Sequence, residues 1–193
     1  MKRLCDILLS LFGLIILCPL LLAVSIWILS DSHGGVFYRQ MRVGMGNRDF
    51  SILKFRTMQT DSDKRGLLTV GGRDCRVTKA GYYLRKYKID ELPQLWNVLK
   101  GDMSFVGPRP EVRKYVEMYT EEQLHVLDVR PGITDAASIK YRNENDLLAH
   151  ASDPERYYIE TIMPDKLRIN LDYVNNNSLL GDLRLILQTL KSI

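Results

Sequence analysis

The uncharged run from Ile7 to Leu29 constrains this chain more than any other feature of its sequence. It is 23 residues long and contains no Asp, Glu, Lys or Arg. As a helix it would extend about 34 Å, enough to cross the hydrocarbon core of a bilayer. A cleaved signal peptide has a shorter apolar core and small residues at its cleavage site, a pattern that residues 30–34 do not match. The run therefore predicts a membrane-embedded helix.

Pro19 lies in the middle of this run, where a proline removes a backbone hydrogen bond and favours a kink. Basic residues flank the run on both sides, namely Lys2 and Arg3 before it and Arg39, Arg42 and Arg48 after it. Positive residues prefer the cytoplasmic side of a membrane, so two basic flanks favour a helix that enters and leaves by one face. We expect a re-entrant helix broken at Pro19. A kinked spanning helix stays open, because prolines also occur in spanning helices.

Composition and charge describe the rest of the chain. The 193 residues are enough for one domain with a hydrophobic core, and the net charge of +4 does not by itself argue for nucleic acid. Residues 73–88 hold six basic side chains and a single acid, Asp74. Such a run suits an anionic neighbour, such as a phosphate or a lipid headgroup, although a solvated basic helix face explains it equally well. Three cysteines without a Cys-x-x-Cys motif fit a reducing compartment.

The local patterns predict an α+β fold that is mainly helical. Two stretches rich in β-formers, 36–42 and 50–58, flank a glycine-rich turn and predict a β-hairpin. Residues 59–77 are polar and predict a loop. Helices are expected over 78–88, over 92–99 with Gly101 as the stop, and over 111–127, 154–162 and 165–174. A rigid loop is expected at 107–110 and a turn at 130–133.

The C-terminal segment 179–193 has one apolar face at helical spacing. A helix that packs on the core is the simpler interpretation. An amphipathic helix lying in the membrane interface is the alternative, and the apolar run near the N-terminus favours it.

The sequence lacks the common phosphate-binding, hydrolase and zinc-protease motifs, and its three histidines are scattered. Asp61-Ser62-Asp63 is an Asp-x-Asp, which some nucleotide-sugar enzymes use to hold a divalent metal. A three-residue match arises easily by chance, so this motif alone is weak evidence for a metal site.

Asp90-Glu91 is better placed, at the start of the predicted amphipathic helix. The plain interpretation is that Asp90 is the N-cap of that helix. A helix N-terminus also attracts phosphate, and Arg85 and Lys88 lie just upstream. Such surroundings keep a carboxylate ionised, and an ionised carboxylate can attack phosphorus or bind Mg²⁺. From the residues alone, both the cap and the nucleophile stay open.

The stretch from Asp90 to Glu111 closely resembles the signature of the monotopic phosphoglycosyl transferases, the bacterial sugar transferase family. Lys54 to Met58 is similar to a second block of that family, and Arg130 to Thr134 to a third. The apolar start with its central proline also resembles the re-entrant membrane helix of the family. The match covers nearly the whole chain in the order of the family.

The resemblance implies an enzyme that transfers a sugar-1-phosphate from a UDP-sugar to polyprenol phosphate, with undecaprenyl phosphate as the expected lipid, and releases UMP. The family forms a covalent aspartyl-phosphosugar intermediate, which makes Asp90 the expected nucleophile. Glu91 would assist through metal or proton handling, and Mg²⁺ is the expected cofactor, held at Asp90 and Glu91. Arg85 and Arg109 are expected to bind phosphate.

Further expectations follow from the same resemblance. Lys54 and Arg56 would lie near the same pocket, and the basic run would face phosphates and headgroups at the membrane surface. Residues 1–32 would form the re-entrant helix, and residues 33–193 a catalytic domain on the cytoplasmic face of the bacterial inner membrane. The partners would be the UDP-sugar, polyprenol phosphate and membrane lipid, without nucleic acid and with downstream glycosyltransferases as candidates.

One departure from the family pattern follows the third block. Many members continue Gly-Trp-Ala-Gln, whereas this chain has Asp135-Ala136-Ala137-Ser138. The reaction class does not depend on these residues, but a sugar or nucleotide contact of the loop does.

Two other function classes are compatible with the residues. A phosphohydrolase or nucleotidyl transferase could reuse the same aspartate chemistry, and would release UMP without a lipid acceptor. A non-enzymatic membrane adaptor would bind nucleotide sugar or lipid without turnover.

Overall fold

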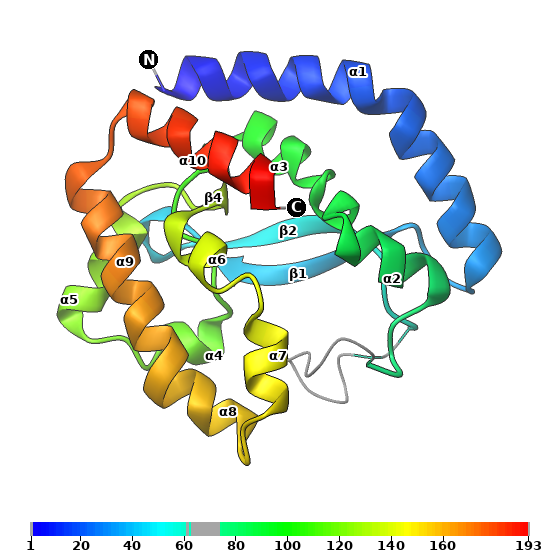
Figure 1. The fold of residues 1–193 in the computed structure, drawn as a ribbon. Coiled ribbons are helices and arrows are strands. Elements are labelled where there is room, and N and C mark those ends of the chain that lie inside the picture. The colour runs from blue at the N-terminus through cyan, green and yellow to red at the C-terminus, as the bar shows by residue number, and fades with distance from the viewer. Residues whose placement is uncertain (1, 61, 63–73, 193) are drawn as a thin grey trace.

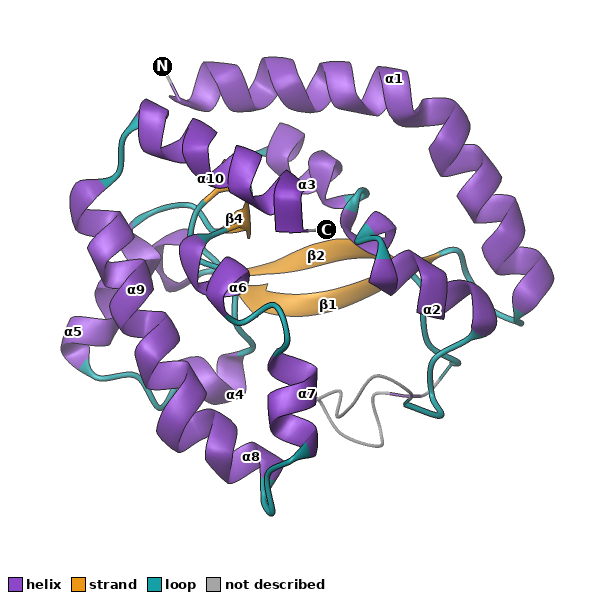
Figure 2. Cartoon of the chain, viewed as in Figure 1, coloured by secondary structure: helices purple, strands orange, loops and turns teal. Residues whose placement is uncertain are grey.

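A long N-terminal helix, α1 (Lys2–Asp31), extends along a body of short helices and two small sheets in the computed structural model, which describes residues 2–60, 62 and 74–192 (Figures 1 and 2). The helix is long and apolar enough to cross a membrane, and only 11% of its most apolar window is buried in the molecule. Its exposed side chains are large and apolar, among them Leu8, Phe12, Ile16 and Ile26. A helix with this surface is not the core helix of a soluble domain.

The α1 helix changes direction partway along its length (Figure 1), and Pro19 lies inside it. Because one helix extends from Lys2 to Asp31, the proline bends the element without ending it. The expected break at Pro19 is therefore a bend within a single helix.

The beginning of α1 is fixed to the body by polar contacts. The Lys2 ammonium donates to the carbonyl oxygen of Val106 at 2.9 Å and pairs with Asp182 at 2.7 Å. The carboxylate of Asp6 is buried and accepts a hydrogen bond from the hydroxyl of Ser104 at 2.9 Å.

The end of α1 is fixed to the same body. Val24 and Ile28 pack against Phe55 and Leu84, and Asp31 accepts a hydrogen bond from the amide of Ala80 at 3.0 Å. A straight 30-residue helix would separate its ends by about 45 Å. Attachment of both ends to one body therefore favours the re-entrant alternative over the spanning one.

The predicted hairpin is confirmed as β1 (Phe37–Val43) and β2 (Asp49–Phe55), an antiparallel pair joined by a short turn. The register pairs Phe37 with Phe55 and Val43 with Asp49. Inside the turn Gly46 has φ of +66°, which a glycine adopts without strain.

The predicted basic helix and the amphipathic helix are confirmed as α2 (Lys79–Lys86) and α3 (Gln94–Lys100), and Gly101 ends α3 with φ of +107°. A buried amide locks α3 to the hairpin. The side chain of Asn97 accepts from the amide of Leu53 at 2.9 Å and donates to the carbonyl oxygen of Ser51 at 2.8 Å. The two segments that carry the predicted site residues therefore hold a fixed position relative to each other.

A second sheet was not predicted. It pairs β3 (Ser104–Val106) with β4 (Gly132–Thr134) in parallel. The two backbones approach closely, because a Cβ atom on Gly132 would lie 2.1 Å from the amide nitrogen of Gly107. Two glycines are needed for this approach, which fixes the loop that follows β3.

The remaining elements are helical: α4 (Arg113–Val116), α5 (Glu121–Leu124), η4 (His125–Asp128), α6 (Ala136–Lys140), α7 (Glu144–Ala149), α8 (Pro154–Tyr157), η5 (Tyr158–Ile162), α9 (Met163–Asn176) and α10 (Leu179–Ser192). The single helix predicted over 111–127 was wrong, since the segment holds three short pieces. The boundary predicted near 163 was also wrong, because α8, η5 and α9 follow one another directly. Pro164 falls in the first turn of α9, where proline is tolerated.

The C-terminal helix α10 confirms the predicted amphipathic pattern, but its apolar side does not face the core. Leu180, Leu183, Leu187 and Leu190 are all at least half exposed. The buried side chain among those described in α10 is Asp182, which accepts from the hydroxyl of Tyr173 at 2.7 Å. The core-packing interpretation was therefore wrong.

Candidate active site

The carboxylate pair lies between two helices, on the short 3-10 helix η3 (Ile89–Glu91) that connects α2 to α3. The residue before it, Lys88, has a left-handed backbone with φ of +55°. A side chain other than glycine adopts this conformation at a cost of roughly 1 kcal/mol or more. The strained residue turns the chain at the end of α2 and so sets the direction of the following carboxylates.

Glu91 is held by two cations. The Lys54 ammonium lies 2.8 Å from Oε1 of Glu91, and the guanidinium of Arg109 reaches the same oxygen at 2.5 Å. A second guanidinium nitrogen of Arg109 donates to Oε2 at 3.3 Å. Three segments far apart in the sequence, namely β2, η3 and the loop after β3, therefore meet at one carboxylate.

Asp90 has the opposite environment. It is 8% exposed, and its Oδ1 atom is buried without a hydrogen-bond partner in the part of the chain that the structure describes. A buried carboxylate oxygen that lacks a donor is costly, and an orphaned polar atom of this kind is a common mark of a catalytic position.

The structure rejects the interpretation of Asp90 as a helix cap. The N-cap of α3 is Pro93, and no side chain caps this helix. Asp90 lies three residues earlier, within η3. The cap interpretation assumed that the helix begins at Asp90, whereas the described α-helix begins at Gln94.

The surroundings shift the pKa values of Asp90 and Glu91 in opposite directions. Burial raises the pKa of Asp90, and the negative charge of Glu91 adds to this effect, against the lowering by Lys54 and Arg85. For Glu91, burial also acts to raise the pKa, but the positive charges of Arg109 and Lys54 outweigh it and hold the pKa well below its ordinary value. Glu91 is therefore the more firmly ionised of the two.

The pKa values of the three cations are shifted as well. Burial lowers the pKa of Lys54, and the carboxylates of Glu91 and Asp90 offset only part of the effect. The carboxylate of Glu91 raises the pKa of Arg109. Burial also lowers the pKa of Arg85.

The structure brings Lys54, Arg109 and Glu91 into direct contact and places Arg85 near them. The guanidinium of Arg85 donates to the hydroxyl of Thr57 at 2.9 Å, and its charge acts on Asp90. A Cβ atom on Gly81 would lie 2.0 Å from the carbonyl oxygen of Thr57, so this glycine allows α2 to pack against the end of the hairpin.

Arg56 makes its hydrogen bonds at a different place. Its guanidinium donates to the carbonyl oxygen of Gly35 at 2.6 Å and to the hydroxyl and carbonyl oxygens of Ser32 at 2.7 and 2.9 Å. It is buried and fixes the connection between α1 and β1. The structure therefore does not bring Arg56 together with the carboxylate pair.

Two polar residues of the site were missed. Thr57 is buried and orients Arg85. Gln94 is 1% exposed, and neither its amide nitrogen nor its amide oxygen has a partner among the described residues. Gln94 is the first residue of α3, four positions after Asp90 in the chain. A glutamine beside the apolar positions of an amphipathic helix was the only available signal.

Metal ligands are sparse. No group of three His, Cys, Asp or Glu side chains that could hold a metal ion occurs among the described residues. The Asp-x-Asp candidate lies outside the described residues, apart from Ser62. Near η3, the oxygens of Glu91 accept from two cations, whereas Oδ1 of Asp90 has no partner. A hard cation bound to a diphosphate needs one or two carboxylates, so the pair fits Mg²⁺ if phosphate oxygens complete the shell.

Comparison with known proteins identifies the family of the chain. The family model described as bacterial sugar transferase matches residues 1–193. The chain is 38% identical over its full length to the UDP-N-acetylgalactosamine-undecaprenyl-phosphate N-acetylgalactosaminephosphotransferase of Aeromonas hydrophila, of which it spans 43%. It is 36% identical over its full length to the uncharacterized sugar transferase EpsL of Bacillus subtilis, of which it spans 87%. It is also 36% identical to the UDP-glucose:undecaprenyl-phosphate glucose-1-phosphate transferase of Xanthomonas campestris, of which it spans 37%.

Proposed function

The chain belongs to the bacterial sugar transferase family, and from this membership we propose that it transfers a sugar-1-phosphate from a UDP-sugar to polyprenol phosphate and releases UMP. The names of the Aeromonas and Xanthomonas relatives support a UDP-sugar donor and undecaprenyl phosphate as the acceptor. The chain spans less than half of each of these two relatives. The observation that carries the proposal is the buried Oδ1 atom of Asp90, which has no partner among the described residues, beside a glutamate that two cations hold.

In the first step, an oxygen of the Asp90 carboxylate attacks the phosphorus that carries the sugar. The bond from that phosphorus to the oxygen of the UMP phosphate breaks, and UMP leaves with its electron pair. Burial of Oδ1 without a hydrogen-bond donor among the described residues favours this attack, because a desolvated carboxylate oxygen is a stronger nucleophile than a solvated one.

In the second step, a phosphate oxygen of the lipid attacks the phosphorus of the aspartyl-phosphosugar. The bond between Asp90 and phosphorus breaks, and the free carboxylate is restored. The product is the sugar linked to the lipid through a diphosphate, as the first membrane step of a glycoconjugate or polysaccharide pathway.

The cations of the site neutralise the phosphates. Lys54 and Arg109 face one another across Glu91, so a diphosphate that approaches can take hydrogen bonds from both. Glu91 keeps the two cations in place before the donor arrives. Arg85 adds charge on the side of Asp90.

Mg²⁺ is the proposed cofactor, with Asp90 and Glu91 as its protein ligands and the diphosphate as the remaining source of oxygens. When bound it would neutralise charge on the leaving phosphate. The unpartnered oxygen of Asp90 supports this assignment, while Glu91 can join only if one of its two cations moves.

The apolar surface of α1 supports a location in the bacterial inner membrane, with the catalytic body on the cytoplasmic face, where nucleotide sugars are made. In this arrangement α1 dips into one leaflet and returns, and the exposed leucines of α10 lie in the interface. The acceptor phosphate and the active site then share one membrane surface.

The experiment incubates the full chain in detergent or nanodiscs with Mg²⁺ and a panel of UDP-sugars, with and without undecaprenyl phosphate, and measures UMP. We expect one or a few donors to yield UMP continuously only when the lipid is present. Continuous UMP release without the lipid would identify a hydrolase instead. Donor binding without any UMP would identify an adaptor.

A further inference from the structure

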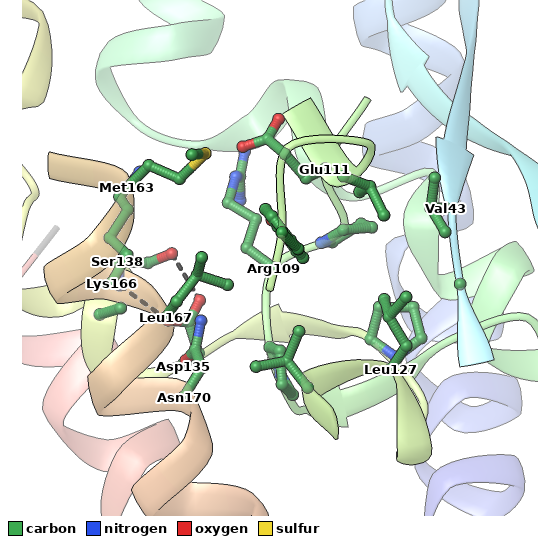
Figure 3. A pocket seen from close by; sticks show the side chains of 18 of the residues that line it. Val43, Arg109, Glu111, Leu127, Asp135, Ser138, Met163, Lys166, Leu167 and Asn170 are labelled. Atoms are coloured by element: carbon green, nitrogen blue, oxygen red, sulfur yellow. Dashed lines mark hydrogen bonds between the residues drawn. The ribbon is translucent and has the colours of Figure 1, made fainter. Parts of the chain in front are cut away.

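Arg109 connects the carboxylate pair to a cavity. Its guanidinium pairs with Glu91, and the residue also lines a partly open cavity formed by the loop after β3, the start of α6 and one face of α9 (Figure 3). None of the residues proposed above to act on phosphate, apart from Arg109, lines this cavity. Its occupant is therefore a separate question from the chemistry at Asp90.

The cavity wall carries hydrogen-bond acceptors that are buried. Asn170 on α9 is 6% exposed, and its Oδ1 atom has no hydrogen-bond partner among the described residues. Asp135, at the N-cap of α6, is 1% exposed, and its carboxylate accepts from the amide and the hydroxyl of Ser138 at 2.9 and 2.5 Å. A buried amide oxygen without a donor costs free energy, and a ligand that supplies a donor recovers it.

The rest of the wall is mixed: it includes the apolar residues Pro108, Val126, Pro131 and Leu167. It also includes Glu111 and Lys166, whose charges pair with Arg42 and Glu144. The cavity is partly open and small, about 40 Å³, so it admits the hydroxyl-bearing edge of a ring rather than a whole ring. The carboxylate of Asp135 lies in the same wall, so a second negative charge is unfavourable there. The groups that fit are neutral and carry hydrogen-bond donors on a ring with apolar faces.

We propose that this cavity binds the hydroxyl-bearing edge of a ring of the nucleotide-sugar donor, while the diphosphate of the same donor lies against Arg109. This inference rests on the proposed function. Asn170 accepts a hydrogen bond from a ring hydroxyl through its free Oδ1, and Asp135, held by Ser138, offers a second acceptor. The ribose and the transferred pyranose share this chemistry.

The position of Asp135 and Ser138 gives the proposal a second support. They place an acceptor in the cavity wall that Arg109 also lines, and the charge of Asp135 acts to raise the pKa of Arg109. Variation at these positions would then change which ring hydroxyls are recognised.

The test measures binding of UDP-sugars and of UMP, in the presence of Mg²⁺, to the full chain carrying Asp90→Asn, which removes turnover. Asn170→Ala is added in this background, and Asn175→Ala, an exposed asparagine of the same helix, is the matched control. We expect Asn170→Ala to weaken binding of the preferred UDP-sugar about tenfold, the effect of one lost hydrogen bond. The control should leave the affinity unchanged.

The measurement distinguishes the ribose from the transferred pyranose. If UMP binding is unchanged while UDP-sugar binding falls, the cavity holds the pyranose. If both fall by the same factor, it holds the ribose. Unchanged UDP-sugar binding in a folded Asn170→Ala protein would overturn the proposal.

A second variant keeps the test decisive if Asn170→Ala fails to fold. Ser138→Ala removes the hydroxyl that orients Asp135 without removing the N-cap carboxylate. We expect a smaller loss of UDP-sugar affinity, about threefold, and an unchanged affinity would count against the proposal. Failure of the proposed function gives a different signature, since the wild-type chain would then release UMP continuously without lipid or release none at all, whatever Asn170 does.

Discussion

Asp90 and Glu91 are neighbours in the chain, yet their carboxylates have opposite surroundings. Both oxygens of Glu91 accept hydrogen bonds from cations, whereas Oδ1 of Asp90 is buried without a partner among the described residues. The ion pairs fix one carboxylate as a structural anion and leave the other available to react. This difference supports the proposal that Asp90 attacks the donor and that Glu91 organises the cations proposed to bind phosphate.

Replacement of Asp90 by asparagine separates activity from stability. We expect Asp90→Asn to reduce UMP release by roughly 10⁴-fold or more, because an amide is a poor nucleophile. The midpoint of thermal unfolding should not fall, because the substitution removes a buried charge that burial disfavours. Both quantities are measured on the same detergent-solubilised protein.

The matched control for this variant is Asp172→Asn, on the exposed side of α9. It should change neither quantity. Turnover of Asp90→Asn at the wild-type rate would exclude the covalent mechanism.

Replacement of Glu91 by glutamine should lower the stability of the protein. Glu91→Gln leaves Lys54 and Arg109 close together without their shared anion. We expect a loss of about 2 kcal/mol in the free energy of unfolding, below the range for a fully buried pair because Arg109 is partly exposed. Chemical denaturation measures this difference.

The double variant Glu91→Gln with Lys54→Met tests the cause. Removing the stranded cation should restore part of the stability, and the two effects should not add. Additive losses would show that Glu91 and Lys54 do not interact.

The dependence of kcat/KM on pH follows from two shifted pKa values. The nucleophile must be deprotonated, and burial raises the pKa of Asp90, so activity should fall on acidification at a pH above 3.8. The phosphate-binding ammonium must be protonated, and burial lowers the pKa of Lys54, so activity should fall on alkalinisation at a pH below 10.5. We expect a bell-shaped profile inside these limits.

Lys54→Arg tests whether Lys54 causes the fall of kcat/KM at alkaline pH, called here the alkaline limb, because a guanidinium keeps its proton throughout this range. The limb should move to higher pH in this variant, while the acidic limb stays. An alkaline limb at the same pH in both proteins would assign it to another group.

The sequence predicted the elements that local patterns determine. Alternating residues and a glycine-rich turn specified the hairpin, and the apolar positions up to Leu99 with the stop at Gly101 specified α3. The parallel pair of β3 and β4 was missed, because each strand has three residues and their pairing depends on a contact between distant glycines. Short parallel strands carry no periodic signal of their own.

The same limit applies to the site. The family signature predicted Asp90, Glu91 and Arg109 as site residues, but the ion pairs of Glu91 depend on how β2 and the loop after β3 meet. Arg56 lies two residues after Lys54, and at the end of β2 the chain turns it toward Ser32 instead. Sequence spacing does not reveal which way a side chain points beyond the last strand residue.

The topology of α1 is tested by labelling single cysteines from each side of the membrane. Two single-cysteine chains are made, one that keeps only Cys5 and one that carries only His33→Cys, with the other native cysteines replaced by serine. We expect both positions to react from the cytoplasmic side, because the body holds both ends of α1. Reaction from opposite sides would establish a spanning helix.

The most direct test of the account is the mass of the peptide that carries the nucleophile. The wild-type chain is incubated with its preferred UDP-sugar and Mg²⁺ without lipid, quenched in acid and cleaved after lysine and arginine, which releases residues 89–100. We expect a mass increase of one sugar phosphate on Asp90, formed with a stoichiometric burst of UMP and absent from Asp90→Asn. A wild-type enzyme that turns over with lipid yet forms neither the adduct nor the burst would contradict the covalent mechanism.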